Sequence, residues 1–83
     1  MAKPDLPITI AALPKGDAEI HVTLDEYKGT RTIDIRVFEK FSPASAVTPT
    51  RKGVTLAISR LPELARALAD AERQARELGL LDG

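Results

Sequence analysis

The sequence predicts an α+β domain, in which a four-stranded antiparallel β-sheet is followed by one C-terminal α-helix (ββββα). In three segments between residues 20 and 58, apolar residues alternate with polar ones, which is the period of a strand with one buried face. From Ser59 onward the apolar residues recur at spacings of three and four, which is the period of an amphipathic helix. Strands first and one helix last indicate a sheet with the helix packed on one of its faces.

The length and cysteine content limit how such a domain can be stabilised. The chain has 83 residues, which fits one domain, and we expect residues 1–7 to be a flexible tail and residues 8–81 to be that domain. A domain of this size buries little core alone. It contains no cysteine, so neither a disulfide nor a cysteine-based zinc site can stabilise it. We therefore expect a homodimer, because oligomerisation is the remaining common source of stability.

The first three strands are each bounded by a turn signal. Residues 8–13 predict a short strand that ends at the proline- and glycine-containing turn sequence of residues 14–17. Residues 20–25 alternate and predict the second strand. The Lys-Gly pair at 28–29 then leads into the third strand, at residues 32–38. So short a connection predicts that the second and third strands form an antiparallel hairpin.

The last strand and the helix complete the predicted fold. Residues 42–50 show no periodicity and contain two prolines, so we expect an exposed loop there. The last strand should enter through Gly53. The helix is predicted to begin after Ser59, a plausible N-cap, and to run to about Leu78, with Gly79 as its stop signal. Its leucines and alanines form one apolar stripe, and its charged residues lie off that stripe.

Charge is unevenly distributed along the chain, although the net charge is zero. Residues 1–26 hold two cations against five acids, a balance of −3, and residues 56–83 hold four against five, a balance of −1. Residues 27–55 hold six cations against two acids, a balance of +4. These cations are Lys28, Arg31, Arg36, Lys40, Arg51 and Lys52. The local field steers a polyanion more than the total charge does, so the middle third is the predicted binding region.

Aromatic residues accompany these cations. Tyr27 lies at a hairpin turn, where we expect an exposed ring. By alternation, Phe38 lies on the same sheet face as Arg36, where it is either exposed or buried by a dimer partner. Phe41 lies past the strand and is expected to anchor the loop or the dimer. Cations for phosphates and exposed rings for bases are what a surface for unpaired nucleic-acid strands requires.

No catalytic role, metal site or cofactor is predicted. His21 is the only histidine and has neither the sequence context of a catalytic nucleophile nor the ligand spacing of a metal site. No stretch reaches transmembrane length, and the N-terminus lacks the apolar core of a signal peptide. We therefore expect a cytoplasmic protein, associated with the nucleoid if it is bacterial, with no membrane partner.

Three motifs in order resemble the transcriptional positive cofactor four family. They are Tyr27-Lys28-Gly29, Ile33-Asp34-Ile35-Arg36 and the segment at residues 49–56, which a helix follows. Members of that family are single-stranded-DNA-binding coactivator domains of four antiparallel strands and a helix, and they form homodimers. The resemblance implies this fold and the binding of single-stranded DNA or RNA with little sequence specificity, in transcription. RNA polymerase and other transcription proteins become candidate partners.

The resemblance also assigns roles to individual residues. It implies that Tyr27 stacks on a base and that Gly53 brings the last strand close to the nucleic acid. It implies that phosphates are met by Lys28, Arg36, Arg51 and Lys52. The rest of the expected surface is Arg31, Phe38 and Lys40.

Some positions depart from the family pattern. Asp25, Thr30 and Thr48 stand where members often carry a basic residue, and Glu39 stands where an aromatic residue is common. With the zero net charge, these departures support a second hypothesis, in which the domain keeps the fold but docks a protein such as a polymerase. The cations would then be an ordinary solvated surface.

Overall fold

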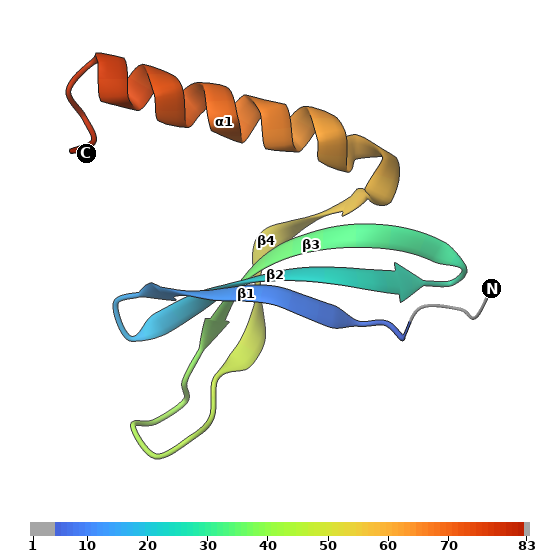
Figure 1. Cartoon of the computed structure of the whole chain (residues 1–83). Coiled ribbons are helices and arrows are strands. Elements are labelled where there is room, and N and C mark those ends of the chain that lie inside the picture. The colour runs from blue at the N-terminus through green and yellow to red at the C-terminus, as the bar shows by residue number, and fades with distance from the viewer. Residues whose placement is uncertain (1–4, 83) are drawn as a thin grey trace.

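The computed structural model describes residues 5–82 and consists of one four-stranded sheet followed by a helix (Figure 1). The elements are β1 (Ile8–Lys15), β2 (Ala18–Tyr27), β3 (Thr30–Glu39), β4 (Thr48–Ala57), the 3₁₀ turn η1 (Ile58–Arg60) and α1 (Leu61–Glu77). The strands are antiparallel and neighbours in the order β1-β2-β3-β4. The predicted α+β class is therefore confirmed. Of the predicted tail, residues 1–4 lie outside the described residues.

Two tight turns join the first three strands. Between β2 and β3, Lys28 and Gly29 have φ angles of 51° and 79°, so both central residues are left-handed, as in a type I′ turn. The predicted Lys-Gly hairpin is confirmed. Between β1 and β2 the turn is only Gly16-Asp17, and β1 is longer than predicted because residues 14 and 15 still pair with β2. A proline at position 14 is tolerated because β1 is an edge strand.

The strand register gathers the apolar side chains on one face of the sheet. Val22 lies opposite Ile35, which lies opposite Val54, and the neighbouring row is Leu24, Ile33 and Leu56. This is the face that the alternation predicts. Within residues 5–82, however, Ile33 is the only buried hydrophobic residue, at 3% exposure. A single chain therefore does not close a core over this face.

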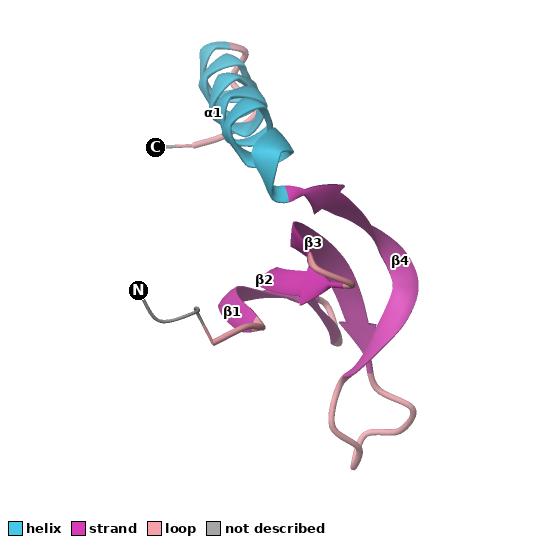
Figure 2. Cartoon of the chain, turned by 90° about the vertical axis from the view of Figure 1, so that its right-hand side faces the viewer, coloured by secondary structure: helices cyan, strands magenta, loops and turns pink. Residues whose placement is uncertain are grey.

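The helix does not pack across the sheet, and that prediction is wrong for the single chain. Its main contact is with η1, and none of its residues is buried. Leu68 and Leu78 on the apolar stripe are 58% and 71% exposed. The views in Figures 1 and 2 agree that α1 extends away from the strands. The sequence periodicity identifies the apolar side of the helix but carries no information about what covers it.

The two ends of the helix differ in how their backbone groups are satisfied. The N-cap is Arg60, without a side-chain capping bond, and Ser59 lies inside η1, so the predicted Ser59 cap is wrong. At the other end Gly79 has a φ of 75°, and the amide of Leu80 donates to the carbonyl of Ala75 at 2.7 Å. This is the glycine-dependent Schellman arrangement, and the predicted stop at Gly79 is confirmed.

The fourth strand begins earlier than predicted. The expected loop at residues 42–50 ends before Thr48, because Thr48 and Pro49 already pair with Glu39 and Phe38 of β3. Arg51 and Lys52 precede the residue at which the strand was expected to begin, but they lie within β4. Gly53 is a mid-strand residue rather than the entry to the strand.

Candidate nucleic-acid interface

The sheet face opposite the apolar rows carries most of the predicted site. One row of this polar face consists of His21, Arg36 and Gly53, which lie opposite one another on β2, β3 and β4. The adjacent row consists of Thr23, Asp34 and Thr55. The alternation that defines the apolar face therefore also determines which polar side chains lie next to one another.

The first cationic feature is the hairpin tip, formed by Tyr27 and Lys28. Tyr27 is 67% exposed, as predicted. The Lys28 ammonium nitrogen lies 5.3 Å from the ring centroid, a cation–π distance. The type I′ turn places the two side chains together, so the tip presents an exposed aromatic ring with a positive charge over one of its faces.

A hollow of about 690 Å³ extends from this tip over the polar face. We call it the tyrosine hollow. Its lining consists of Asp25, Tyr27, Lys28, Thr30, Thr32, Asp34, Arg36 and Thr55. Three predicted site residues, Tyr27, Lys28 and Arg36, are thus brought together. The hollow also contains Asp25, whose one polar contact among residues 5–82 is the backbone amide of Glu26, which donates to Oδ1 at 2.7 Å.

Arg36 lies at the far side of the tyrosine hollow and is held by its neighbours. Its Nε donates to Asp34 Oδ2 at 3.1 Å, and its Nη2 donates to Asp34 Oδ1 at 2.9 Å. Thr55 Oγ1 accepts from Nη2 at 3.1 Å and itself donates to Asp34 Oδ1. This bidentate arginine–carboxylate ion pair fixes the orientation of both side chains, and its charge-assisted hydrogen bonds are stronger than those between neutral groups.

The two charges of this pair change each other's pKa. Burial alone would raise the pKa of Asp34, but hydrogen bonds from Arg36 and Thr55 and the positive charge of Arg36 outweigh burial and lower that pKa below 3.8. The hydrogen bond from Arg36 to Asp34, with a smaller contribution from their attraction, raises the pKa of Arg36 despite desolvation. Both groups are therefore charged at neutral pH.

The second cationic feature is a bulge in β4. Gly53 lies opposite Arg36 and Pro49 lies opposite Phe38, so three residues of β4 face only Val37 of β3. We call these three residues, Thr50, Arg51 and Lys52, the β4 bulge. The Arg51 side chain is exposed, and the structure shows no polar partner for it among residues 5–82. Lys52 Nζ lies 3.5 Å from Glu39 Oε2 in an exposed pair, which contributes little stability.

Gly53 has a packing role that the sequence did not reveal. A Cβ atom there would lie 2.5 Å from the carbonyl oxygen of Ile35 and 2.8 Å from the Cα of Arg36. Only glycine permits this approach of β4 to β3. Its expected role in bringing the strand close to nucleic acid stays a prediction.

Three further predicted site residues lie away from the tyrosine hollow. The Phe38 ring stacks on that of His21, with centroids 3.8 Å apart and planes 11° apart, so one of its faces is already covered. Arg31 Nε lies 3.5 Å from Glu26 Oε1. By the alternation along β3, the Arg31 side chain lies on the apolar side of the sheet. Lys40 follows the end of β3 and is exposed.

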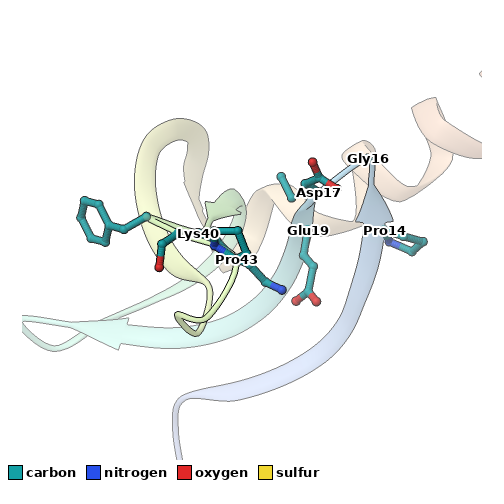
Figure 3. Close-up of a pocket in the computed structure, with 9 residues that line it drawn as sticks. Pro14, Gly16, Asp17, Glu19, Lys40 and Pro43 are labelled. Carbon is teal, nitrogen blue, oxygen red and sulfur yellow. The ribbon is translucent and has the colours of Figure 1, made fainter.

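Lys40 lines a second hollow of about 670 Å³, between the β1–β2 turn and the loop after β3. Figure 3 shows Lys40 and Pro43 on one side of this hollow and Asp17 and Glu19 on the other. Phe41 also lines it but is 89% exposed, so it does not anchor the loop within one chain, and its alternative role as an anchor of the dimer stays a prediction.

Sequence reasoning missed the network around Arg36 and the bulge. A signal for the ion pair was present, because Asp34 and Arg36 are two residues apart in a strand and therefore share a face. The contacts with Thr50 and Thr55 depend on the register between β3 and β4, which no local pattern specifies.

Residues 5–82 contain no group of three or more side chains arranged to bind a metal ion. No helix among them is both long and apolar enough to span a membrane.

Comparison with known proteins gives a consistent result. Residues 15–67 match the family described as Transcriptional Coactivator p15 (PC4). A crystal structure of a PC4 homolog from Burkholderia pseudomallei is 26% identical and superposes with a TM-score of 0.71, covering 87% of this chain and 97% of that one. Its second crystal form is 25% identical, with a TM-score of 0.69 over 81% of this chain and 98% of the other.

A more distant structure shares the fold alone. It is the bacteriophage T5 homolog of the eukaryotic transcription coactivator PC4, described as implicated in recombination-dependent DNA replication. It is 16% identical, with a TM-score of 0.51, over 88% of this chain and 96% of that chain. Among curated proteins, none matches the sequence. The family match covers more than half of the chain and agrees with the strand order and the C-terminal helix, and the protein therefore belongs to the Transcriptional Coactivator p15 (PC4) family.

Proposed function

We propose that this protein binds single-stranded nucleic acid on the polar face of its sheet and serves as a transcription coactivator or regulator. The observation that carries the proposal is the exposed Tyr27 ring beside the Lys28 ammonium, at the mouth of a hollow that reaches Arg36. Membership of a coactivator family supports the same role.

The binding mode follows from the chemistry of the two cationic features. A base stacked on Tyr27 would contribute about 1–3 kcal/mol, and every base has a face that can stack. Lys28 at the hairpin tip and Arg51 and Lys52 in the β4 bulge supply positive charge for phosphates. Neither interaction reads the edge of a base, so little sequence preference is expected.

A homodimer is part of the proposal. The apolar stripe of α1 and the apolar rows of the sheet are both uncovered in one chain, and a second copy can cover them. Two hairpin tips on one dimer would hold two segments of the same strand, which raises the overall affinity without new contacts. Sedimentation should give the mass of a dimer, and Leu68→Glu should produce monomers that unfold more easily. A sedimentation mass of one chain for the wild type at micromolar concentration would contradict the proposed homodimer.

One observation favours a second candidate function, the docking of a transcription protein. Asp34 neutralises Arg36, Glu39 lies beside Lys52, and Asp25 places a carboxylate in the tyrosine hollow. Each reduces the positive potential that a nucleic acid would meet. In this alternative the sheet or the helix binds RNA polymerase or another transcription protein.

The deciding experiment is a titration of fluorescently labelled oligo-dT, and of its duplex, with the protein at two salt concentrations. We expect the protein to bind the single strand more tightly than the duplex. The logarithm of the binding constant for the single strand should fall linearly with the logarithm of the salt concentration, with a slope of about −0.7 for each phosphate contacted. Co-purification of the protein with nucleic acid, seen as a raised ratio of absorbance at 260 nm to that at 280 nm, would support the same function. Absence of single-strand binding at low salt would refute this function and favour protein docking.

A further inference from the structure

The β4 bulge is the least regular part of the sheet and holds two of the predicted phosphate contacts. Three of its residues oppose one residue of β3, so the normal ladder cannot satisfy all its backbone groups. A bulge that keeps one conformation needs other partners for those groups. The contacts that supply them show which residues determine the direction of Arg51 and Lys52.

Within residues 5–82, three hydrogen bonds that involve a side chain hold the bulge, and all of them include Thr50. Its hydroxyl donates to the Val37 carbonyl at 2.7 Å and accepts from the Lys52 amide at 3.1 Å. Its carbonyl accepts from Arg36 Nη1 at 2.9 Å. The bond to the Lys52 amide lies within β4, whereas the other two come from neighbouring residues of β3, and only the bond from Arg36 comes from a side chain of the polar face.

Arg36 is poorly suited to hold a phosphate itself. A guanidinium carries five N–H donors. Within the described residues every nitrogen of this guanidinium already donates: Nε and Nη2 to Asp34, Nη2 also to Thr55, and Nη1 to the Thr50 carbonyl. Its charge is matched by a carboxylate oxygen at 2.9 Å. A phosphate would therefore meet a nearly neutral pair with most of its donors in use.

We propose that Arg36 is a positioning residue, which acts on nucleic acid through the β4 bulge and not by contact with phosphate. Asp34 and Thr55 orient the guanidinium, the guanidinium holds the Thr50 carbonyl, and the held bulge presents Arg51 and Lys52 to the strand. Fixing these cations before binding reduces the conformational entropy lost on binding. The inference rests on the proposed function and adds to it a residue that works without touching the ligand.

A double-mutant cycle separates positioning from contact. Arg36→Met keeps the stem and removes the fork, and Thr50→Val removes the hydroxyl without changing any charge. Each is combined with the Arg51→Ala/Lys52→Ala pair, and all are titrated with oligo-dT. We expect each to weaken binding about tenfold in the wild-type background, within the range of coupling between contacting residues. In the Arg51→Ala/Lys52→Ala background each should have almost no effect.

A direct phosphate contact gives the opposite pattern and would overturn the proposal. Arg36→Met would then weaken binding equally in both backgrounds and lower the salt slope by about 0.7. Arg36→Lys gives a second distinction. A lysine keeps the charge but cannot reproduce the fork, so it should restore a phosphate contact but behave like Arg36→Met if Arg36 only positions the bulge.

One measurement requires no nucleic acid and therefore tests this inference independently of the proposed function. The Lys52 amide is bonded to Thr50, so its hydrogen exchange reports whether the bulge is held. Arg36→Met should accelerate exchange at Lys52 while amides of the β1–β2 pair keep their rates. Unchanged exchange at Lys52 would refute the proposal, and uniformly faster exchange would show that the residue only stabilises the fold.

Discussion

The hairpin tip and the β4 bulge both present cations, but they are built differently. The tip is determined by four consecutive residues, because a two-residue turn with positive φ angles brings Tyr27 and Lys28 together. The bulge is held from a distance, by Arg36 of β3, 14 residues from Thr50 in the chain. A change in the body of the sheet should therefore leave the tip intact and disturb the bulge.

The largest expected effect is on the junction of β3 and β4. Gly53→Ala would place a Cβ atom 2.5 Å from the Ile35 carbonyl oxygen, so the strands must separate. We expect a loss of about 2–3 kcal/mol in the free energy of unfolding, the usual cost of overpacking. Gly16→Ala is the matched control, since nothing lies within 4 Å of its Cβ position and only its φ of 58° opposes the change. The free energy of unfolding is measured by chemical denaturation. If the two variants lose equal amounts of it, the close approach of β3 and β4 at Gly53 is contradicted.

The second prediction concerns the tip alone. Tyr27→Ala should weaken binding of oligo-dT by about 1–3 kcal/mol, because the stacking surface is removed. The thermal midpoint should barely change, since Tyr27 is 67% exposed. Tyr27→Phe is the control and should bind like the wild type. If phenylalanine is as weak as alanine, the hydroxyl and not the ring is the contact.

The third prediction concerns pH and the support of the bulge. Asp34 has a lower pKa in the folded chain than its ordinary value, so its carboxylate stabilises the fold above that ordinary value, about 4. This contribution is lost as the pH falls through the lower, folded-state pKa. The difference in unfolding free energy between the wild type and Asp34→Asn should be constant near neutrality and shrink toward pH 2. A difference that does not change with pH would exclude the ion pair as its source.

The smallest expected effect is a gain in affinity. Asp25→Asn removes a negative charge from the tyrosine hollow and should strengthen binding of oligo-dT by about twofold to fivefold at low salt. The gain should shrink as salt is added. Asp82→Asn changes the net charge equally at an exposed position near the C-terminus and serves as the control. Equal gains from both variants would indicate an effect of net charge only.

The same contrast explains how much could be predicted from the sequence. The strands around Ile20–Leu24 and Ile33–Val37, the Lys28-Gly29 turn and the Gly79 stop are confirmed, because period and turn chemistry are local properties. The exposed Tyr27 belongs to that local part as well.

The errors have non-local causes. The start of β4 was misplaced because pairing with Glu39 and Phe38 overrides the loop-like composition around Pro49. The stacking of Phe38 on His21 and the engagement of Arg36 by Thr50 both depend on register between strands. The apolar stripe of α1 was identified, but what covers it is not encoded in the spacing of its leucines.

The β4 bulge has a further consequence for how copies of the protein behave in a crowded solution. β4 is an edge of the sheet in the described chain, and an unpaired edge is a template on which strands of other molecules can add. Pro49 offers no amide hydrogen, and the bulge that follows takes the edge out of a regular ladder. Charged Arg51 and Lys52 beside them would repel a like edge. The irregularity that presents the cations thus also protects the protein against edge-to-edge aggregation.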